Sequence, residues 1–177
     1  MIIKMTEADK NFIETCKEIL EHGYSSEGTN VRTRWDDGAE ANYISIVGVT
    51  NKYDVGKEFP MITLRNNTNT VMRAIDEILW IWQKKSNNVN DLNSHIWDQW
   101  AGEDGTIGKA YGYQMAKKYD FKTKNGMMKM DQVDFVLNLL KNDTSSRRIM
   151  TNIFNFEDLK DMNLEPCAYG TQWLVKG

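Results

Sequence analysis

Hydrophobic residues recur at helical spacing in three stretches of the chain. The first predicted helix begins after a Thr6 cap, runs to about His22 and ends at Gly23. Apolar residues at three- and four-residue spacing form one of its faces; they are Phe12, Ile13, Cys16, Ile19 and Leu20. Because an unpaired cysteine commonly packs as a small hydrophobe, we expect Cys16 to lie in the core.

Two more helices follow from the same pattern. One is predicted over about 69–85, with a core stripe formed by Val71, Ile75, Ile78, Leu79 and Trp82. Its second half, 78–82, is apolar all round, so we expect burial on more than one side. The other is predicted over about 131–141, where the apolar positions are Val133, Val136, Leu137 and Leu140.

Strands are predicted where β-branched and aromatic residues gather, at about 42–49, 148–154 and 168–175. The stretches 24–41 and 86–114 are polar or rich in loop signals, and 59–63 is a short extended segment. Strands and helices do not alternate regularly, which favours an α+β fold over a doubly wound α/β fold. Since no repeat or low-complexity linker divides the chain, one domain over 1–177 is expected.

Composition limits the classes of function. The chain has 177 residues and a formal charge of −3, which argues against nucleic-acid binding by bulk charge. Its two cysteines, Cys16 and Cys167, are too few for a disulfide framework or a zinc quartet, so reduced thiols in a cytoplasmic protein are expected. No apolar stretch approaches the length of a membrane span, and residues 1–10 lack the core of a signal peptide.

Cys167 is the strongest candidate for chemistry. It follows Pro166, one of only two prolines in the chain. A cysteine attacks as the thiolate, which cationic neighbours favour, and the adjacent Arg147 and Arg148 offer rigid forks that match a phosphate. The combination indicates a nucleophile beside a phosphate-bearing substrate. A regular strand would send these two arginines to opposite faces, however, and an exposed arginine pair is more often solvated surface.

Two aromatic motifs and one acid are weaker candidates. Glu77 lies opposite the predicted core stripe; a solvated surface acid is the commoner interpretation, but its face is apolar, and an apolar cavity suits a carboxyl group for general acid–base work. Trp97 and Trp100 could stack on a flat heteroaromatic ligand or pack as ordinary core. Tyr111 stands between two glycines that would let the backbone approach a ligand, although a tyrosine packed in a turn is more common.

Histidine and glycine patterns point to no further chemistry. His22 and His95 have no partners at metal-ligand spacing, and neither a Ser-His-Asp set nor a Walker or Rossmann glycine loop is present. We therefore expect no metal site.

Seven stretches, taken together and in this order, resemble the thymidylate synthase family: 31–33, 59–63, 76–80, 96–100, 108–112, 142–143 with 146–149, and 166–167. The resemblance covers essentially the whole chain. It implies an α+β fold in which a mixed sheet packs with helices, and a cytoplasmic homodimer. The implied reaction is the reductive methylation of dUMP to dTMP, with 5,10-methylenetetrahydrofolate as co-substrate and no metal.

The resemblance also implies roles for single residues. Cys167 is similar to the family's nucleophile, which adds to C6 of the uracil ring. Glu77 is similar to the carboxylate that, with waters, handles protons at the pyrimidine carbonyl and the folate, and Tyr111 to the active-site tyrosine near the nucleophile. The implied phosphate ligands are Arg32, with Arg147 and Arg148 reaching the partner's site across the dimer. The implied folate wall is Ile96, Trp97 and Trp100.

The chain also departs from the family pattern. Thr144 stands where a proline is usual, and Ala168 where a histidine often follows the nucleophile. The family continues beyond this point with an Arg-Ser-Asp segment, an asparagine that reads the pyrimidine edge, a late His and Tyr for the sugar, and a closing C-terminal tail. We therefore expect an N-terminal portion of the fold, incomplete at its C-terminus and impaired by itself. The alternatives are a pyrimidine deoxynucleotide hydroxymethylase of the same fold and a non-catalytic binding module.

Overall fold

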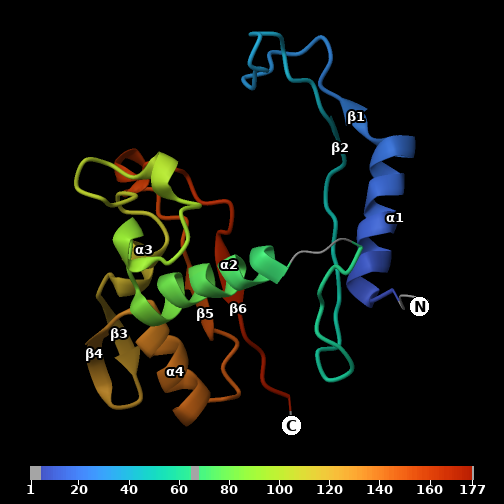
Figure 1. The fold of residues 1–177 in the computed structure, drawn as a ribbon. Coiled ribbons are helices and arrows are strands. Elements are labelled where there is room, and N and C mark those ends of the chain that lie inside the picture. Colours follow the sequence, from blue (N-terminus) through green and yellow to red (C-terminus); the bar gives the residue numbers. More distant parts are fainter. Residues whose placement is uncertain (1–4, 65–67, 177) are drawn as a thin grey trace. The chain divides into compact units, whose positions relative to one another are not determined.

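The computed structural model describes residues 5–64 and 68–176, which form two compact units, Met1–Thr68 and Asn69–Gly177 (Figure 1). The first unit contains helix α1 (Glu7–His22) and an antiparallel pair of short strands, β1 (Tyr24–Ser25) and β2 (Ile44–Ser45). Helix α1 has the predicted bounds, because its signals are local. The Thr6 hydroxyl accepts the Asp9 N–H at 3.1 Å, and the Asp9 carboxylate accepts the Thr6 N–H at 2.9 Å.

Asp9 also anchors the end of this unit. Its buried carboxylate accepts the Thr63 N–H and the Thr63 hydroxyl, both at 2.6 Å, while the Thr6 hydroxyl donates to the Met61 carbonyl at 2.8 Å. The Thr63 hydroxyl bond is the main cause that lowers the pKa of Asp9 to about 2. One carboxylate therefore caps α1 and fixes the predicted extended segment 59–63 against it.

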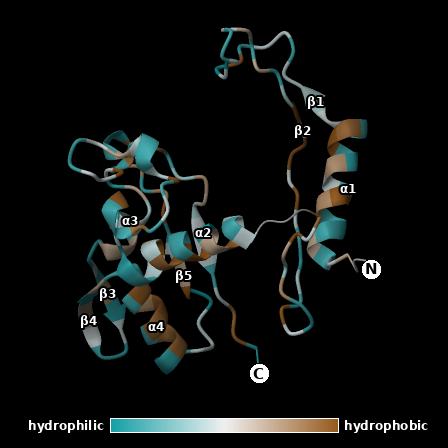
Figure 2. Ribbon diagram, in the orientation of Figure 1, coloured by the Kyte–Doolittle hydropathy of each residue, from teal (hydrophilic) through white to brown (hydrophobic). Residues whose placement is uncertain are grey.

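Two predictions for the first unit are wrong. The strand expected over 42–49 is only two residues long. Cys16 is half-buried rather than core, and Leu20 on the same face is 76% exposed, so the hydrophobic turns that Figure 2 shows along α1 remain largely at the surface. Among the described residues of this unit, the buried apolar side chains are Ala8 and Val31.

The second unit holds the other elements. Its helices are α2 (Thr68–Leu79, whose first residue ends the first unit), α3 (Gly112–Ala116) and α4 (Gln132–Asn142), and its strands are β3 (Tyr119–Thr123), β4 (Gly126–Met130), β5 (Met150–Asn152) and β6 (Gly170–Gln172). A π-helical turn follows α2 at Trp80–Lys84, and 3-10 turns lie at Val89–Asp91, Asp98–Trp100 and Leu159–Asp161. Helix α3 packs against the π-helical turn and against α4, and α4 packs against β5. Phe121 of β3 stacks on Phe135 of α4 at 4.1 Å between ring centroids, which brings the hairpin against that helix (Figure 1).

The α+β class is confirmed. In the part of the chain that the structure describes, the strands pair as three two-stranded antiparallel sheets rather than as one mixed sheet. The β3–β4 hairpin was not predicted, although Asn125-Gly126 is a strong turn signal. Helix α4 matches its prediction and begins at an Asp131 cap, whereas the two last strands are shorter than expected.

The buried face of α2 differs from the predicted one. Val71 is only half-buried, and Ile75, Ile78 and Leu79 are exposed, whereas Trp80 and Ile81 are buried. The more buried residues Asp76, Glu77, Trp80 and Ile81 recur at three- and four-residue spacing and so define the opposite face of the helix. The core of this unit therefore forms around the side of the helix that was expected to be polar; its residues are Trp80, Ile81, Leu92, Trp97, Ile107, Ala110, Tyr111, Met115 and Ile153.

Candidate active site

Three contacts join Glu77, Trp97, Tyr111 and Cys167. The indole N–H of Trp97 donates to Oε1 of Glu77 at 2.7 Å, and the Trp97 ring meets the Tyr111 ring edge-on at 5.2 Å between centroids. The backbone N–H of Cys167 donates to the Tyr111 hydroxyl oxygen at 3.0 Å. Residues up to 90 positions apart (167 − 77 = 90) thus come together in one connected group.

Cys167 is exposed and unpaired, while Pro166 before it is buried. The proline therefore holds the chain against the unit and the thiol faces outward. Glu77 is half-buried, and Trp97, which orients its carboxylate, is 6% exposed. An oriented acid, a buried tyrosine and an accessible thiol are the groups that nucleophilic and proton-transfer chemistry requires.

Tyr111 has an unusual backbone. Its φ of 40° and ψ of −98° lie outside the regions that non-glycine residues normally adopt, so its conformation must be enforced by its surroundings. The flanking glycines contribute to this. A Cβ on Gly112 would overlap the Ser86 carbonyl, and a Cβ on Gly108 would overlap the Asp161 carbonyl. The two glycines therefore admit neighbouring backbone of this chain, whereas the sequence suggested the approach of a ligand.

Burial is the main cause that raises the pKa of the Tyr111 phenol. The Cys167 N–H bond acts in the opposite direction, and the charges of Cys167 and Glu77 add to the rise. Tyr111 therefore keeps its proton at neutral pH.

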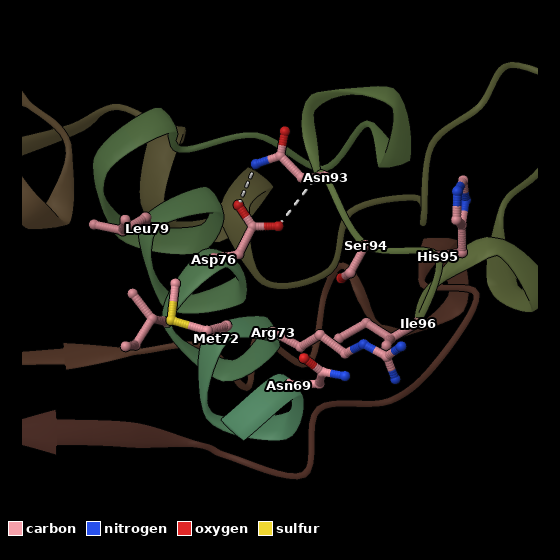
Figure 3. Close-up of a pocket in the computed structure, with 10 residues that line it drawn as sticks. Asn69, Met72, Arg73, Asp76, Leu79, Asn93, Ser94, His95 and Ile96 are labelled. Atoms are coloured by element: carbon pink, nitrogen blue, oxygen red, sulfur yellow. Dashed lines mark hydrogen bonds between the residues drawn. The ribbon is translucent and has the colours of Figure 1, made fainter. Parts of the chain in front are cut away.

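A cavity of about 670 Å³ is lined by Asp76 and Ile96, the sequence neighbours of Glu77 and Trp97, but by none of the four residues of the connected group. Figure 3 shows Arg73 extending from α2 toward Ile96, and the Asp76 carboxylate binding the backbone and side-chain nitrogens of Asn93 at 2.9 and 2.7 Å. In the described part of the chain, the Ser94 hydroxyl oxygen is the one buried side-chain oxygen or nitrogen that has no hydrogen-bond partner. Sequence reasoning assigned no role to Arg73, which belongs to no distinctive motif, or to Asp76, although Asp76 begins the stretch 76–80.

The three residues predicted to contact the folate therefore lie in different surroundings. Ile96 is half-buried and lines the cavity, whereas Trp97 lies in the core and Trp100 is half-buried against it at 5.2 Å between ring centroids. For Trp97 the packing interpretation is correct, combined with the hydrogen bond to Glu77.

None of the three predicted phosphate-binding arginines belongs to the connected group. Arg32 is exposed in a loop of the first unit. Arg147 and Arg148 are both exposed in a turn that precedes β5, so the expectation that they begin a strand and alternate across it is wrong. The phosphate contacts of all three stay a prediction.

Over residues 5–64 and 68–176, no group of three or more His, Cys, Asp or Glu side chains could hold a metal ion. None of the helices that the structure describes is long and apolar enough to cross a membrane.

Comparison with known proteins agrees with this fold. The sequence model of the thymidylate synthase family matches residues 10–177. The chain is 48% identical over 176 residues to the thymidylate synthase of Bacillus subtilis subsp. natto, and 47% identical over 176 residues to that of Bacillus phage phi3T. Both alignments cover 97% of this chain and 61% of the relative.

A solved structure, thermostable thymidylate synthase A from Bacillus subtilis, superposes with a TM-score of 0.86 at 45% identity, over 97% of this chain and 61% of that one. The fold is thus an α+β fold shared over nearly the whole chain with a protein of known structure. The chain belongs to the thymidylate synthase family, and it spans about three fifths of the length of these relatives.

Proposed function

We propose that the protein catalyses the reductive methylation of dUMP to dTMP, with 5,10-methylenetetrahydrofolate as co-substrate. The observation that carries this proposal is the exposed thiol of Cys167, whose own N–H is bound by the hydroxyl of a buried tyrosine within a member of this family. A reduced thiol is needed for the reaction, which fits the cytoplasmic location expected from two unpaired cysteines.

Cys167 is the proposed nucleophile. Its thiolate adds to C6 of the uracil ring, and the electron pair of the C5–C6 double bond becomes an enolate, which makes C5 nucleophilic. The folate, when bound, supplies the one-carbon unit and the hydride that reduces it. C5 would form the bond to the one-carbon unit and lose its proton, the bond between that carbon and the folate nitrogen would break, and hydride addition to the carbon would expel the thiolate from C6, which restores the double bond and leaves dTMP and dihydrofolate.

In this scheme Glu77 transfers protons and Tyr111 positions the backbone of Cys167. Glu77, oriented by Trp97, handles protons with water at the pyrimidine carbonyl and the folate. Tyr111 holds the backbone of Cys167 with its oxygen and keeps its phenolic proton at neutral pH, because burial raises its pKa. Its O–H is therefore a donor for a ligand beside the thiol.

The remaining predicted residues would bind the two substrates. Arg32, together with Arg147 and Arg148 from the partner subunit of a homodimer, would bind the phosphate of dUMP. Ile96 and Trp100 would contact the folate, while Trp97 supports them from the core. The exposure of all three arginines is compatible with binding a phosphate or a second subunit.

The test is the release of tritium from C5 of labelled dUMP. Cys167→Ser is expected to abolish release, while Cys16→Ser, the matched control, leaves it nearly unchanged. A second assay requires binding alone: dUMP should protect Cys167 from iodoacetamide but leave the alkylation of Cys16 unaffected. Protection without any C5 release would support a binding module instead of an enzyme, and equal loss from both serine variants in folded protein would reject the nucleophile.

A further inference from the structure

We propose that Asp158 is a positioning residue that holds Tyr111 in its strained conformation and thereby sets the hydrogen bond between Tyr111 and Cys167. The relevance of this bond to catalysis rests on the proposed function, but the bond itself is measurable without substrate.

Asp158 collects donors from both sides of Tyr111. Its carboxylate is 4% exposed and lies 3.0 Å from the Gln114 amide nitrogen, 2.6 Å from Nζ of Lys117 and 3.3 Å from Nζ of Lys109. The Gln114 bond, followed by the Lys117 bond, lowers the pKa of Asp158 to about 2, so the carboxylate is charged at neutral pH. One buried charge thus ties position 109, before the tyrosine, to positions 114 and 117 after it.

A second set of bonds closes the loop around Tyr111. The Gln114 amide also donates to the Lys109 carbonyl at 2.8 Å, which spans the tyrosine directly. The Lys109 N–H donates to the Asp161 carbonyl at 2.8 Å, and its Nζ lies 2.7 Å from the Asp161 carboxylate. Gln114 is itself completely buried. The backbone on both sides of Tyr111 is therefore fixed by partners on the segment that contains Asp158.

This segment leads directly to the thiol. Asp158 is the N-cap of the 3-10 turn Leu159–Asp161, and Cys167 follows nine residues after Asp158 (167 − 158 = 9). The Tyr111 loop and the Cys167 segment thus meet at Asp158, at Asp161 and at the Tyr111 hydroxyl. A non-glycine residue with positive φ persists only where its surroundings over-determine it. If the contacts of Asp158 are weakened, Tyr111 can relax, and its hydrogen bond with the Cys167 N–H is lost.

The experiment measures hydrogen exchange of the Cys167 backbone amide by NMR on labelled protein. Tyr111→Phe removes the acceptor and should speed exchange roughly three- to tenfold, the factor for one neutral hydrogen bond. Asp158→Asn should speed it by a similar factor, and the double variant no further, because both changes remove the same bond. If Asp158 only stabilised the fold, Asp158→Asn would speed exchange by the same factor in the wild type and in the Tyr111→Phe variant.

Asp131 provides a matched control. It is also a nearly buried carboxylate with two lysine partners, Lys85 at 2.8 Å and Lys118 at 2.7 Å, but of these only Lys118 is near Tyr111 in sequence, so Asp131 does not tie the two sides of the Tyr111 loop together. Asp131→Asn should leave the exchange of the Cys167 amide unchanged, and Asp158→Glu, which keeps the charge, should restore at least part of the protection. If Asp158→Asn does not fold, Lys109→Met removes the Nζ contacts with Asp158 and Asp161 at a half-exposed site and should give a smaller rise.

Three results would overturn the proposal. They are wild-type exchange at Cys167 in folded Asp158→Asn, additive effects in the double variant, and an equal effect from Asp131→Asn. Since the measurement needs neither dUMP nor turnover, its failure would leave the proposed reaction standing, and a failure of the reaction would leave this bond intact.

Discussion

The two units of the chain are stabilised in different ways. In the first, the apolar face of α1 is at most half-buried and a single buried carboxylate, Asp9, organises the ends of the unit. In the second, an apolar core surrounds Trp80, and two buried carboxylates, Asp131 and Asp158, each bind two lysines. The strained tyrosine occurs in the second unit. A conformation of this kind requires a rigid environment, and packing supplies it there.

The largest expected effect contrasts the two kinds of packing. Trp80 is completely buried and Leu20 is 76% exposed. Trp80→Ala should lower the free energy of unfolding by about 3–5 kcal/mol, through lost burial and the cavity left behind. Leu20→Ala should change it by less than about 0.5 kcal/mol. Denaturant unfolding measures both, and equal effects would contradict the contrast.

The next largest effect concerns dUMP binding by the predicted phosphate-binding arginines. A charge-assisted arginine–phosphate contact contributes about 1.5–3 kcal/mol, so Arg32→Ala or Arg148→Ala should each weaken dUMP binding by roughly 10- to 100-fold. Calorimetric titration with dUMP measures this. Glu21→Ala, at an exposed site of α1, is the control and should bind as the wild type does.

Mixed dimers separate the roles of the two arginines. If Arg148 serves the partner's site, subunits with Arg148→Ala combined with subunits with Cys167→Ala form one site with both defects and one with neither, and C5 release returns. The same mixture with Arg32→Ala should stay inactive, because Arg32 is expected to serve its own subunit. Absence of recovery with Arg148→Ala after confirmed subunit exchange would reject the shared site.

A glycine pair tests how closely the backbone packs beside Tyr111. Gly112→Ala forces a Cβ against the Ser86 carbonyl and should lower the free energy of unfolding by about 1–3 kcal/mol. Gly28 has a φ of 78° but open space around it, so Gly28→Ala should cost about 1 kcal/mol from strain alone. Thermal unfolding measures both losses of stability, and a larger loss for Gly28→Ala than for Gly112→Ala would contradict the close packing of Gly112 against Ser86.

The smallest effect concerns acid and the first unit. The fold lowers the pKa of Asp9 from 3.8 to about 2, chiefly through the Thr63 hydroxyl. A lowered folded-state pKa stabilises the fold above about pH 4, and this stabilisation is lost as the pH falls from about 4 toward 2. Thr63→Val should flatten that part of the stability profile, and Thr63→Ser should restore it. A profile that Thr63→Val leaves unchanged would exclude this bond as the cause.

Much of the local structure could be predicted from the sequence. The bounds of α1 and α4 follow from Thr6 and Asp131, whose side chains cap backbone groups three residues away. The choice of Cys167 and Tyr111 as site residues also came from sequence, through motifs in the family's order. Two predictions were wrong: that Arg147 and Arg148 begin a strand, and that Cys16 lies in the core. A local pattern does not show where a strand begins pairing or what covers a helix face.

By itself the sequence determined the α+β class, the caps of its helices and the residues able to carry the chemistry. The tertiary structure decided which face of α2 is buried, that Trp97 orients Glu77, and that Asp158 binds residues on both sides of Tyr111. The physical reason is the range of the interactions. Caps and helical spacing act over three or four residues, whereas the bond from Gln114 to Asp158 joins positions 44 apart and exists only after the whole unit has packed.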